Sequence, residues 1–318
     1  MNILMGNFSV KRFKSKKEVL KQNTIFIFCP ENRTEELQSI LKEYEFELVF
    51  NDYSIKDFSL KVICHFESTN LSKTQKDYLV KATELGAWVE PLVSYLDNRL
   101  GFTEVQLLQS NYFLHQKAFS ILSVKKTQVA KRFIDVLSAI LLILLTLPIG
   151  ILFAILIKLE SRGPIFYKQT RTGQYNEEFE VIKFRSMSRD AEADGAQWAQ
   201  ANDSRVTKVG RFIRKTRIDE LPQFINVLRG EMSMVGPRPE REVFITELEK
   251  EIPYYRFRHA VKPGVTGLAQ ISYPYGASVE DAIWKHKYDI HYIKHHSTFG
   301  DLKIMFKTIK VVLFGLGR

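Results

Sequence analysis

The sequence predicts an α/β protein in which a small parallel-sheet domain precedes a membrane-embedded helical hairpin and a basic second domain. Strand-like and helix-like patterns alternate over residues 24–92. Residues 136–157 then contain no charged side chain. Residues 126–318 carry 30 Lys and Arg against 21 Asp and Glu, whereas residues 1–125 carry 16 against 15. The basic excess of the second part is expected to face phosphates, anionic lipid or nucleic acid.

The composition excludes several classes of protein. At 318 residues the chain is long enough for about two domains, and 45% hydrophobic with 26% charged residues is typical of a globular protein. Cys29 and Cys64 are the only cysteines. A disulfide framework and a Cys-rich zinc site are therefore excluded, and a reducing compartment is expected. Residues 1–17 contain no apolar run long enough for a signal peptide, which favours the cytoplasmic side.

Residues 1–23 are basic and polar and are expected to form a tail, followed by a first domain over 24–100. The turn after its first strand, CPENR, lacks the glycine that would let the backbone approach a pyrophosphate. A structural or regulatory role is therefore favoured over nucleotide binding. Residues 101–130 are expected to be a connector. The expected strands are 24–29, 47–50, 60–66 and 87–92, and the expected helices are 31–44 and 71–86.

The charge-free run at 136–157 is the strongest compositional feature of the chain. A membrane-spanning helix needs about 20 apolar residues. A buried core helix is the less favoured alternative, because so long a charge-free run has no polar face to turn toward water. Pro148 in its middle removes a helical hydrogen bond and is expected to bend or break the helix. Basic residues flank both ends, and the positive-inside rule places both flanks in the cytoplasm. We therefore expect a re-entrant hairpin over residues 131–160, with a straight span as the alternative.

A second membrane element is expected at residues 301–314. Lys303, Lys307 and Lys310 fall on one helical face, with apolar residues around the rest. This pattern suits a helix lying in the lipid headgroup region. A terminal helix that packs on the core fits equally well.

Residues 211–239 hold the densest group of residues suited to phosphate chemistry. Asp219 is expected to cap a helix that runs to Arg229 and stops at Gly230. The helix dipole and the neighbouring arginines are expected to lower the pKa of Asp219 and keep it ionised for attack on phosphorus. The adjacent Glu220 could hold a divalent cation that bridges phosphate oxygens. Plain helix capping is the alternative.

Cationic and glycine-rich segments surround this pair in the sequence. Arg214 belongs to a basic run that matches pyrophosphate oxygens, although a solvated basic face has the same pattern. Arg238 lies between two prolines and is expected to be rigidly placed. Residues 263–267, PGVTG, form a turn that could approach a base or a sugar. The remaining candidate cations are Lys183, Arg185 and Arg205.

Taken together, these segments resemble a known family over residues 125–318. They are KRFID (131–135), GPIFYKQTRTG (163–173), IKFRSM (182–187), SRVTKVGRFIRKTRIDELPQFINVLRGEMSMVGPRP (204–239) and PGVTGLAQ (263–270). Their order resembles the bacterial sugar transferase family of monotopic phosphoglycosyl transferases.

The resemblance implies transfer of a sugar 1-phosphate from a UDP-sugar to undecaprenyl phosphate with release of UMP. It implies that Asp219 forms a covalent phosphosugar intermediate and that Glu220 binds Mg²⁺. This would be the first membrane step of exopolysaccharide, capsule, O-antigen or glycoprotein glycan synthesis, at the cytoplasmic face of a bacterial inner membrane. The residues expected on phosphates are Arg214, Arg238, Arg205, Lys183 and Arg185, and those near uridine or sugar are Pro237, Gly264, Thr266 and Gln270.

The resemblance also implies a compact, mostly helical catalytic domain with short strands over 161–318. Large members carry four membrane helices before a Rossmann-like domain, and WVEPLVSYLDNRLG (88–101) resembles the end of that domain. A truncated large member is therefore expected, whose N-terminal domain is structural and could form a homodimer. The family breaks its hairpin at Ser-Pro, whereas this chain has Leu147-Pro148, where Thr146 could substitute.

Other classes of function remain open from the sequence. A UDP-releasing glycosyltransferase would also use a sugar nucleotide, although the chain has no Asp-x-Asp motif. An inactive membrane scaffold would bind without turnover. No nucleic-acid motif is recognised, so no nucleic-acid partner is expected.

Overall fold

The computed structural model describes residues 24–55, 58, 62–114, 120–188, 191, 203–274, 276 and 278–313. The chain divides into two compact units, residues 1–100 and 101–318, and each is described by itself. The tail expected at 1–23 lies outside the described residues.

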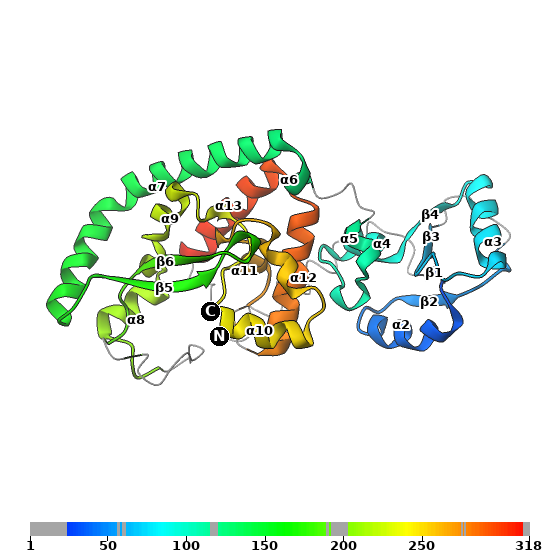
Figure 1. Ribbon diagram of the computed structural model, residues 1–318, viewed down its shortest axis with the longest axis horizontal. Coiled ribbons are helices and arrows are strands. Elements are labelled where there is room, and N and C mark those ends of the chain that lie inside the picture. The colour runs from blue at the N-terminus through cyan, green and yellow to red at the C-terminus, as the bar shows by residue number, and fades with distance from the viewer. Residues whose placement is uncertain are drawn as a thin grey trace. The chain divides into compact units, whose positions relative to one another are not determined.

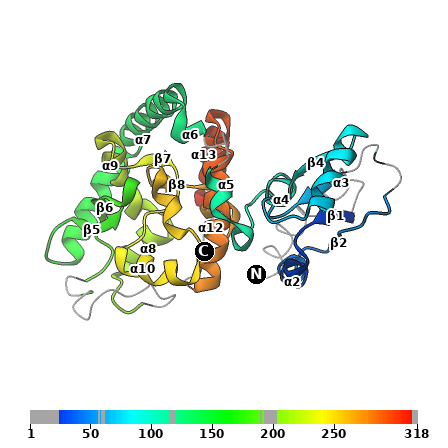
Figure 2. The same cartoon turned by 45° about the vertical axis from the view of Figure 1, so that its right-hand side comes forward.

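The first unit is built on a four-stranded parallel sheet in the order β2-β1-β3-β4, as the alternating pattern predicts. The core contains Phe28, Ile63 and Leu79. Helices α2 and α3 lie beside the strands (Figure 2). The strands are β1 (Thr24–Phe28), β2 (Glu47–Phe50), β3 (Val62–His65) and β4 (Trp88–Pro91), and the helices are α2 (Thr34–Leu41), α3 (Lys73–Glu84) and α4 (Leu92–Leu100).

The helices of this unit follow their local end signals. Helix α3 begins with a capping box in which the Ser72 hydroxyl and the Gln75 side chain each accept from the other residue's backbone N–H. Beyond its C-terminus, Gly86 adopts a positive φ of 93°, which matches the predicted glycine stop. The expected helix at 31–44 is shorter, since residues 31–33 form a 3₁₀ turn before α2.

The second unit is mostly helical with short strands. Strands β5 (Phe166–Thr172) and β6 (Glu178–Phe184) form an antiparallel hairpin, and β7 (Ser233–Val235) pairs in parallel with β8 (Gly264–Thr266). Figure 1 labels β5, β6 and the helices of this unit. The helices are α5 (Ser110–Leu114), α6 (Ser120–Ser123), α7 (Lys125–Glu160), α8 (Lys208–Lys215), α9 (Gln223–Arg229), α10 (Glu242–Glu251), α11 (Leu268–Ser272), α12 (Val279–Lys294) and α13 (Thr298–Leu313).

Helix α7 contains the apolar run and is the one helix of the described chain that is long and apolar enough to cross a membrane. Only 6% of its most apolar window is buried, so a core helix is the wrong interpretation. The helix continues through Pro148 and bends (Figure 1). Pro148 cannot donate to the Leu144 carbonyl, and the Thr146 hydroxyl donates to the Leu142 carbonyl at 2.7 Å.

A buried polar cluster joins the N-terminal end of α7 to the rest of the second unit. The Lys131 ammonium donates to an Asp301 carboxylate oxygen at 2.8 Å and to the Val235 carbonyl at 2.9 Å. One oxygen of Asp135 accepts from the Ser233 hydroxyl and the Met234 N–H. The KRFID segment therefore joins α7 to β7.

The C-terminal end of α7 binds the same unit. Ile157 packs against Phe184 and Ile213. The Glu160 carboxylate accepts from the backbone N–H groups of Lys208 and Val209 at the start of α8. Both ends of the helix are thus anchored to one folded unit, while apolar side chains between them, such as Leu144 at 65% exposure, face outward.

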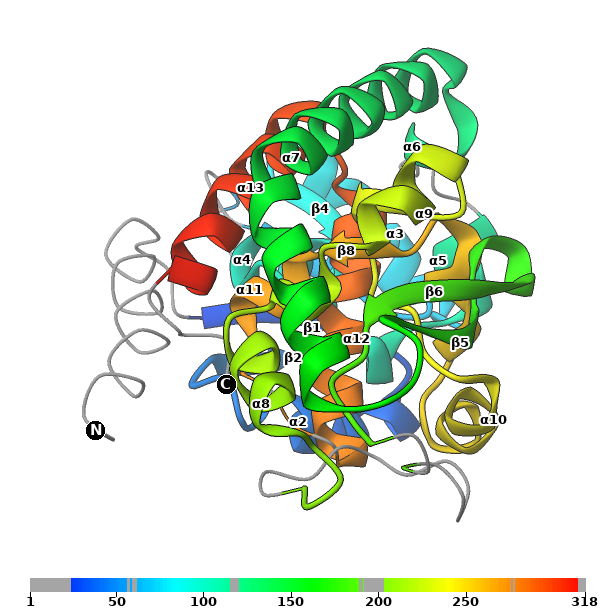
Figure 3. The same cartoon turned by 90° about the vertical axis from the view of Figure 1, so that its left-hand side faces the viewer.

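Helix α13 has one side packed on the unit and another side that is exposed and apolar. Ile304 is buried, and the Thr308 hydroxyl lies 2.7 Å from that of Thr266. Phe299 and Phe306 are exposed at 78% and 73%. Figure 3 shows α13 running beside α7. The helix therefore packs on the unit and also presents an apolar surface, and residue 314 lies outside the described residues.

Candidate active site

The second unit contains a cavity of about 1080 Å³ bordered by the bent helix α7. Its wall is apolar near α7, α11 and α13, where Leu141, Ala269 and Phe306 line it. Ten Lys and Arg and three carboxylates also line the cavity, among neutral side chains. This balance favours a multiply charged anion next to an apolar group.

A tight turn places the acidic pair in this cavity. Arg217 adopts a left-handed φ of 60°, and a 3₁₀ helix follows over Ile218–Glu220. Bonds between residues three apart continue up to Ile225, so helix α9 begins only at Gln223. The expected helix end at Gly230 is confirmed, with φ 84°. The expected N-cap role of Asp219 is wrong, because Asp219 lies inside the turn.

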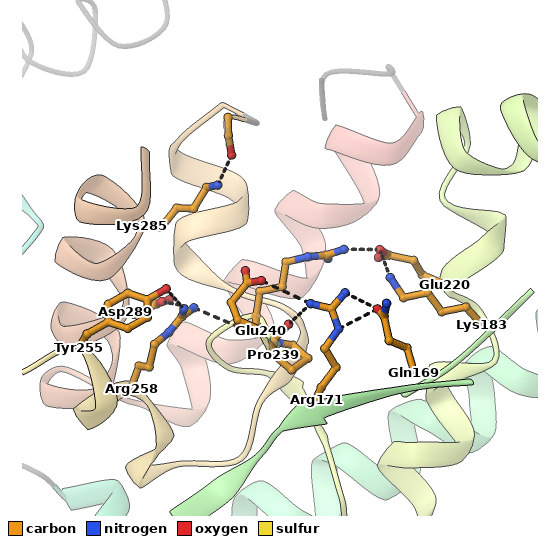
Figure 4. Close-up of polar contacts among 12 residues, drawn as sticks. Gln169, Arg171, Lys183, Glu220, Pro239, Glu240, Tyr255, Arg258, Lys285 and Asp289 are labelled. Carbon is orange, nitrogen blue, oxygen red and sulfur yellow. Dashed lines mark hydrogen bonds and ion pairs between the residues drawn. The ribbon is translucent and has the colours of Figure 1, made fainter. Parts of the chain in front are cut away.

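The two carboxylates of the pair have different surroundings. One oxygen of Glu220 accepts from Arg238 at 2.7 Å and from Lys183 at 3.4 Å (Figure 4). A nitrogen of Arg217 lies 3.9 Å from the same oxygen. The Oδ1 atom of Asp219 is buried and has no hydrogen-bond partner in the described part of the chain. Glu220 is therefore held by cations, while Asp219 presents an unpartnered oxygen.

These surroundings separate the acidities of the pair. Burial, together with the negative charge of Glu220, raises the pKa of Asp219 to about 6. Burial also opposes ionisation of Glu220, but Arg238, Lys183 and Arg217 hold the pKa of that carboxyl well below its usual range. The sequence argument for a lowered Asp219 pKa is thus wrong, because the cations contact Glu220. Asp219 still remains mostly ionised at pH 7.

The loop that carries Arg238 is fixed by close backbone packing. The Gly236 N–H donates to the Thr266 carbonyl and the Gly264 N–H donates to the Pro237 carbonyl. A Cβ on Gly264 would lie 2.1 Å from the Gly236 nitrogen, so this contact requires glycine.

Buried Arg258 holds the same loop from the other side. Its guanidinium donates to the Arg238 carbonyl at 3.0 Å and to Asp289 at 2.8 Å. With its backbone fixed in this way, Arg238 extends its guanidinium to Glu220 and donates to that carboxylate at 2.7 Å.

The structure brings only some of the other predicted residues together. The Lys183 ammonium contacts Glu220 of the acidic pair, and Arg214 and Arg205 line the same cavity. Asp203 holds the Arg205 guanidinium through contacts of 2.6 and 2.8 Å. These positions are compatible with phosphate contacts.

The predicted uridine or sugar residues divide into two groups. Thr266 and Gln270 line the cavity, and the Oε1 atom of Gln270 is buried without a hydrogen-bond partner among the described residues. Pro237 and Gly264 are buried and are not among the lining residues. These two residues instead pack together in the loop that carries Arg238, where the Gly264 N–H donates to the Pro237 carbonyl.

Arg185 also lines the cavity, but its guanidinium already has hydrogen-bond partners outside the acidic pair. Its guanidinium donates to the carbonyls of Ser161 and Arg162 at 2.8 and 3.0 Å, just beyond the C-terminus of α7. A cation there satisfies carbonyls that have no partner within the helix. The structure therefore assigns the Arg185 guanidinium to the end of α7.

We expect Arg185→Met to act on stability first. Losing hydrogen bonds from a charged donor to partly buried carbonyls should lower the free energy of unfolding by about 1.5–3 kcal/mol. Arg185→Lys keeps the charge without the planar fork, so its free energy of unfolding should lie between those of Arg185→Met and the wild type. Chemical denaturation in detergent micelles measures both. Unchanged stability together with weaker nucleotide binding would instead support a phosphate contact.

Sequence reasoning did not select Arg171, which lines the cavity. Its guanidinium contacts Glu240 at 3.4 Å and Gln169 (Figure 4). The Arg171–Glu240 contact joins β5 to the segment after Arg238, and the two residues are 69 positions apart in the sequence. The alternation of β5 was the only local signal that could have shown which way Arg171 points.

The site fits one mode of magnesium binding. The described residues contain no group of three or more His, Cys, Asp or Glu that could hold a metal by itself. Mg²⁺ at phosphoryl sites commonly uses one or two carboxylates, with substrate phosphates and water completing its shell. The ionised Glu220 supplies one such carboxylate, and the unpartnered Oδ1 of Asp219 stays available for attack on phosphorus.

Comparison with known proteins agrees with the motif order. The family model described as bacterial sugar transferase matches residues 126–315. The chain belongs to the bacterial sugar transferase family. The match includes α7, the acidic pair and the Arg238 loop.

Several relatives are similar over this region. A UDP-N-acetylgalactosamine-undecaprenyl-phosphate N-acetylgalactosaminephosphotransferase of Aeromonas hydrophila is 49% identical over 187 residues, covering 59% of this chain and 44% of the relative. A UDP-glucose:undecaprenyl-phosphate glucose-1-phosphate transferase of Caulobacter vibrioides is 42% identical over 185 residues, covering 58% and 69%. The undecaprenyl-phosphate glucose phosphotransferase of Komagataeibacter xylinus is 44% identical over 190 residues, covering 58% and 36%. The chain thus spans less than half the length of two of these three relatives.

Proposed function

We propose that this protein transfers a sugar 1-phosphate from a UDP-sugar to undecaprenyl phosphate and releases UMP. The observation that carries the proposal is the buried, unpartnered oxygen of Asp219 beside a Glu220 held by three cations. The cavity supports it, because a cationic region suits the diphosphate and an apolar region suits the polyprenyl chain. Relatives named as undecaprenyl-phosphate sugar phosphotransferases support the same reaction.

The proposed chemistry has two displacements at one phosphorus. A carboxylate oxygen of Asp219 attacks the β-phosphorus, the bond to the bridging oxygen breaks, and UMP leaves with that oxygen. A phosphate oxygen of undecaprenyl phosphate then attacks the same phosphorus and releases Asp219. Arg238 and Lys183, which contact Glu220, would neutralise phosphate charge in both displacements. Mg²⁺, held by Glu220 and substrate phosphates, would add further charge neutralisation.

The raised Asp219 pKa makes activity depend on pH. Asp219 must be ionised to attack, so kcat/KM should fall as the pH drops through about 6 in the free enzyme. Lys183→Met removes a positive charge that lowers this pKa, so its acid limb should move to higher pH. Initial rates from pH 5 to 8 test both statements. A profile with no acid limb in this range would contradict the assignment.

We further propose that α7 enters and leaves the membrane on one face, the cytoplasmic face of a bacterial inner membrane. Its two ends are anchored to one folded unit through Lys131 and Glu160. A straight span would place these ends on opposite faces. The exposed apolar residues between them and the bend support a re-entrant course.

Cysteine labelling tests this topology. Thr127→Cys and Arg162→Cys, each in a background with both native cysteines replaced by serine, place one thiol at either end of α7. An impermeant maleimide should label both thiols in inverted inner-membrane vesicles and neither in intact spheroplasts. Labelling of the two thiols from opposite faces would establish a straight span.

The reaction is tested by the nucleotide that is released. Purified protein is incubated with Mg²⁺, undecaprenyl phosphate and a panel of UDP-sugars that includes N-acetylgalactosamine and glucose. UMP release that requires the acceptor for turnover would support the proposal. Release of UDP would indicate a glycosyltransferase of another class. Donor binding without any released nucleotide would indicate an inactive scaffold.

A further inference from the structure

The cavity extends past Arg238, away from the acidic pair, into a second region of mixed charge. Arg171, Glu240, Arg241 and Lys285 line this region. In Figure 4, Glu240 lies between Arg258 and Arg171, and Lys285 lies on the side away from Glu220. The group comes from β5, the segment before α10, and α12. Neither displacement of the proposed reaction involves these four side chains.

Polar contacts hold the members of this region in place. Arg171 contacts Glu240 at 3.4 Å, and the Lys285 ammonium donates to the Gly276 carbonyl at 2.5 Å. Burial is the largest cause of the lowered pKa of Lys285; the charges of Glu240 and Asp281 raise this pKa, and the charge of Arg238 lowers it. The charge of Arg238 also lowers the pKa of Arg171, so Arg238 lies near both cationic groups. Arg238 therefore stands between the acidic pair and this second region.

Apolar and aromatic side chains complete the wall. Phe244, Leu248 and Tyr273 line the cavity beside the charged group. Arginine and lysine bind phosphate oxygens, a carboxylate accepts hydrogen bonds from sugar hydroxyls, and an aromatic face stacks on a planar base. These three chemistries together match a nucleoside monophosphate.

We infer that this region, which we call the α10–α12 subsite, binds the nucleoside monophosphate part of the sugar nucleotide. The inference rests on the proposed function. Arg241 and Lys285 contact the α-phosphate, Glu240 accepts from the ribose hydroxyls, and the base lies against Phe244 or Tyr273. With the β-phosphorus at Asp219, the nucleoside then points away from the apolar wall of α7 and α13. The acceptor chain and the nucleoside thus occupy opposite regions of the cavity.

This placement differs from the sequence-based one. From the sequence, the turn at 263–267 could approach a base or a sugar, yet Gly264 packs against Gly236. Thr266 lines the cavity and its hydroxyl lies 2.7 Å from that of Thr308 on α13, toward the apolar wall. The α10–α12 subsite combines cations, a carboxylate and aromatic rings in one place.

The test measures UMP binding by calorimetry on the full chain in detergent micelles, together with the KM values for both substrates. Lys285→Met and Arg241→Met should each weaken UMP binding by about 10- to 100-fold, the range for one charged hydrogen bond. Each should raise the donor KM and leave the undecaprenyl phosphate KM unchanged. Lys250→Met, which removes an exposed charge from α10, is the matched control and should bind UMP as the wild type does.

A third variant separates a ligand contact from a structural role. The wild type should bind UMP more tightly than 2′-deoxy-UMP, because Glu240 accepts from the ribose. Glu240→Gln, which keeps an acceptor toward Arg171, should reduce this preference. Wild-type UMP binding that Lys285→Met and Arg241→Met both leave unchanged would refute the subsite while leaving the proposed function intact. A wild type that binds no UMP and releases none would refute both.

Discussion

Asp219→Asn is expected to abolish sugar-phosphate transfer, with a fall in kcat of at least about four orders of magnitude, as for loss of a catalytic nucleophile. Asparagine has nearly the same shape, but its amide cannot form the mixed anhydride with phosphorus. The measurement is UMP release with the donor that the wild type uses. Activity within tenfold of the wild type would exclude Asp219 as the nucleophile.

The same variant allows a direct search for the intermediate. Wild-type protein mixed with donor and no acceptor should gain the mass of one phosphosugar, and Asp219→Asn should gain nothing. Fold is checked by thermal unfolding. Because burial raises the pKa of Asp219 above its value in the unfolded chain, the ionised side chain destabilises the folded state as the pH rises through about 6. At pH 7 the Asn variant should therefore unfold at the same or a higher temperature.

Arg238→Met should cause the second largest loss, about 10²- to 10³-fold in kcat/KM. The guanidinium holds Glu220 at 2.7 Å and faces the cavity where the diphosphate is proposed to bind. Its loss removes the proposed phosphate contact and leaves Glu220 with Lys183 and the more distant Arg217. Arg238→Lys keeps the charge without the planar fork and should recover part of the activity.

The pH profile of Arg238→Met separates this role from a general loss of structure. Arg238 is one of the charges that lower the pKa of Asp219, so removing it should move the acid limb to higher pH. Lys250→Met is again the control for a lost positive charge on the second unit. A kcat/KM within a few-fold of the wild type, with an unmoved acid limb, would contradict the assignment of Arg238.

Much of the fold follows from local sequence signals. Alternating strands and helices predict the parallel sheet of the first unit, and the glycines at 86 and 230 mark helix ends that the structure confirms. The position of the acidic pair beside a basic run also follows from the motif order. These features depend on residues close in the chain, where periodicity and backbone preference act.

The roles of individual cations within the site did not follow in this way. Arg185 and Arg171 both belong to strand-like segments, yet Arg185 binds carbonyls at the end of α7 and Arg171 binds Glu240. The local sequence pattern cannot distinguish the roles of these two arginines, because each partner lies in a segment that only the tertiary packing brings close. The same holds for Lys131, whose partner Asp301 lies 170 residues away.

The sequence alone determined the chain's motif order, its apolar helix with a central proline, and the presence of two adjacent carboxylates among cations. The tertiary structure decided which carboxylate the cations contact. Because they converge on Glu220 from β6, the turn before α9 and the Arg238 loop, Asp219 is left buried with a raised pKa and an unpartnered oxygen. Electrostatic energy depends on distance and burial in space, and neither is encoded by adjacency in the chain.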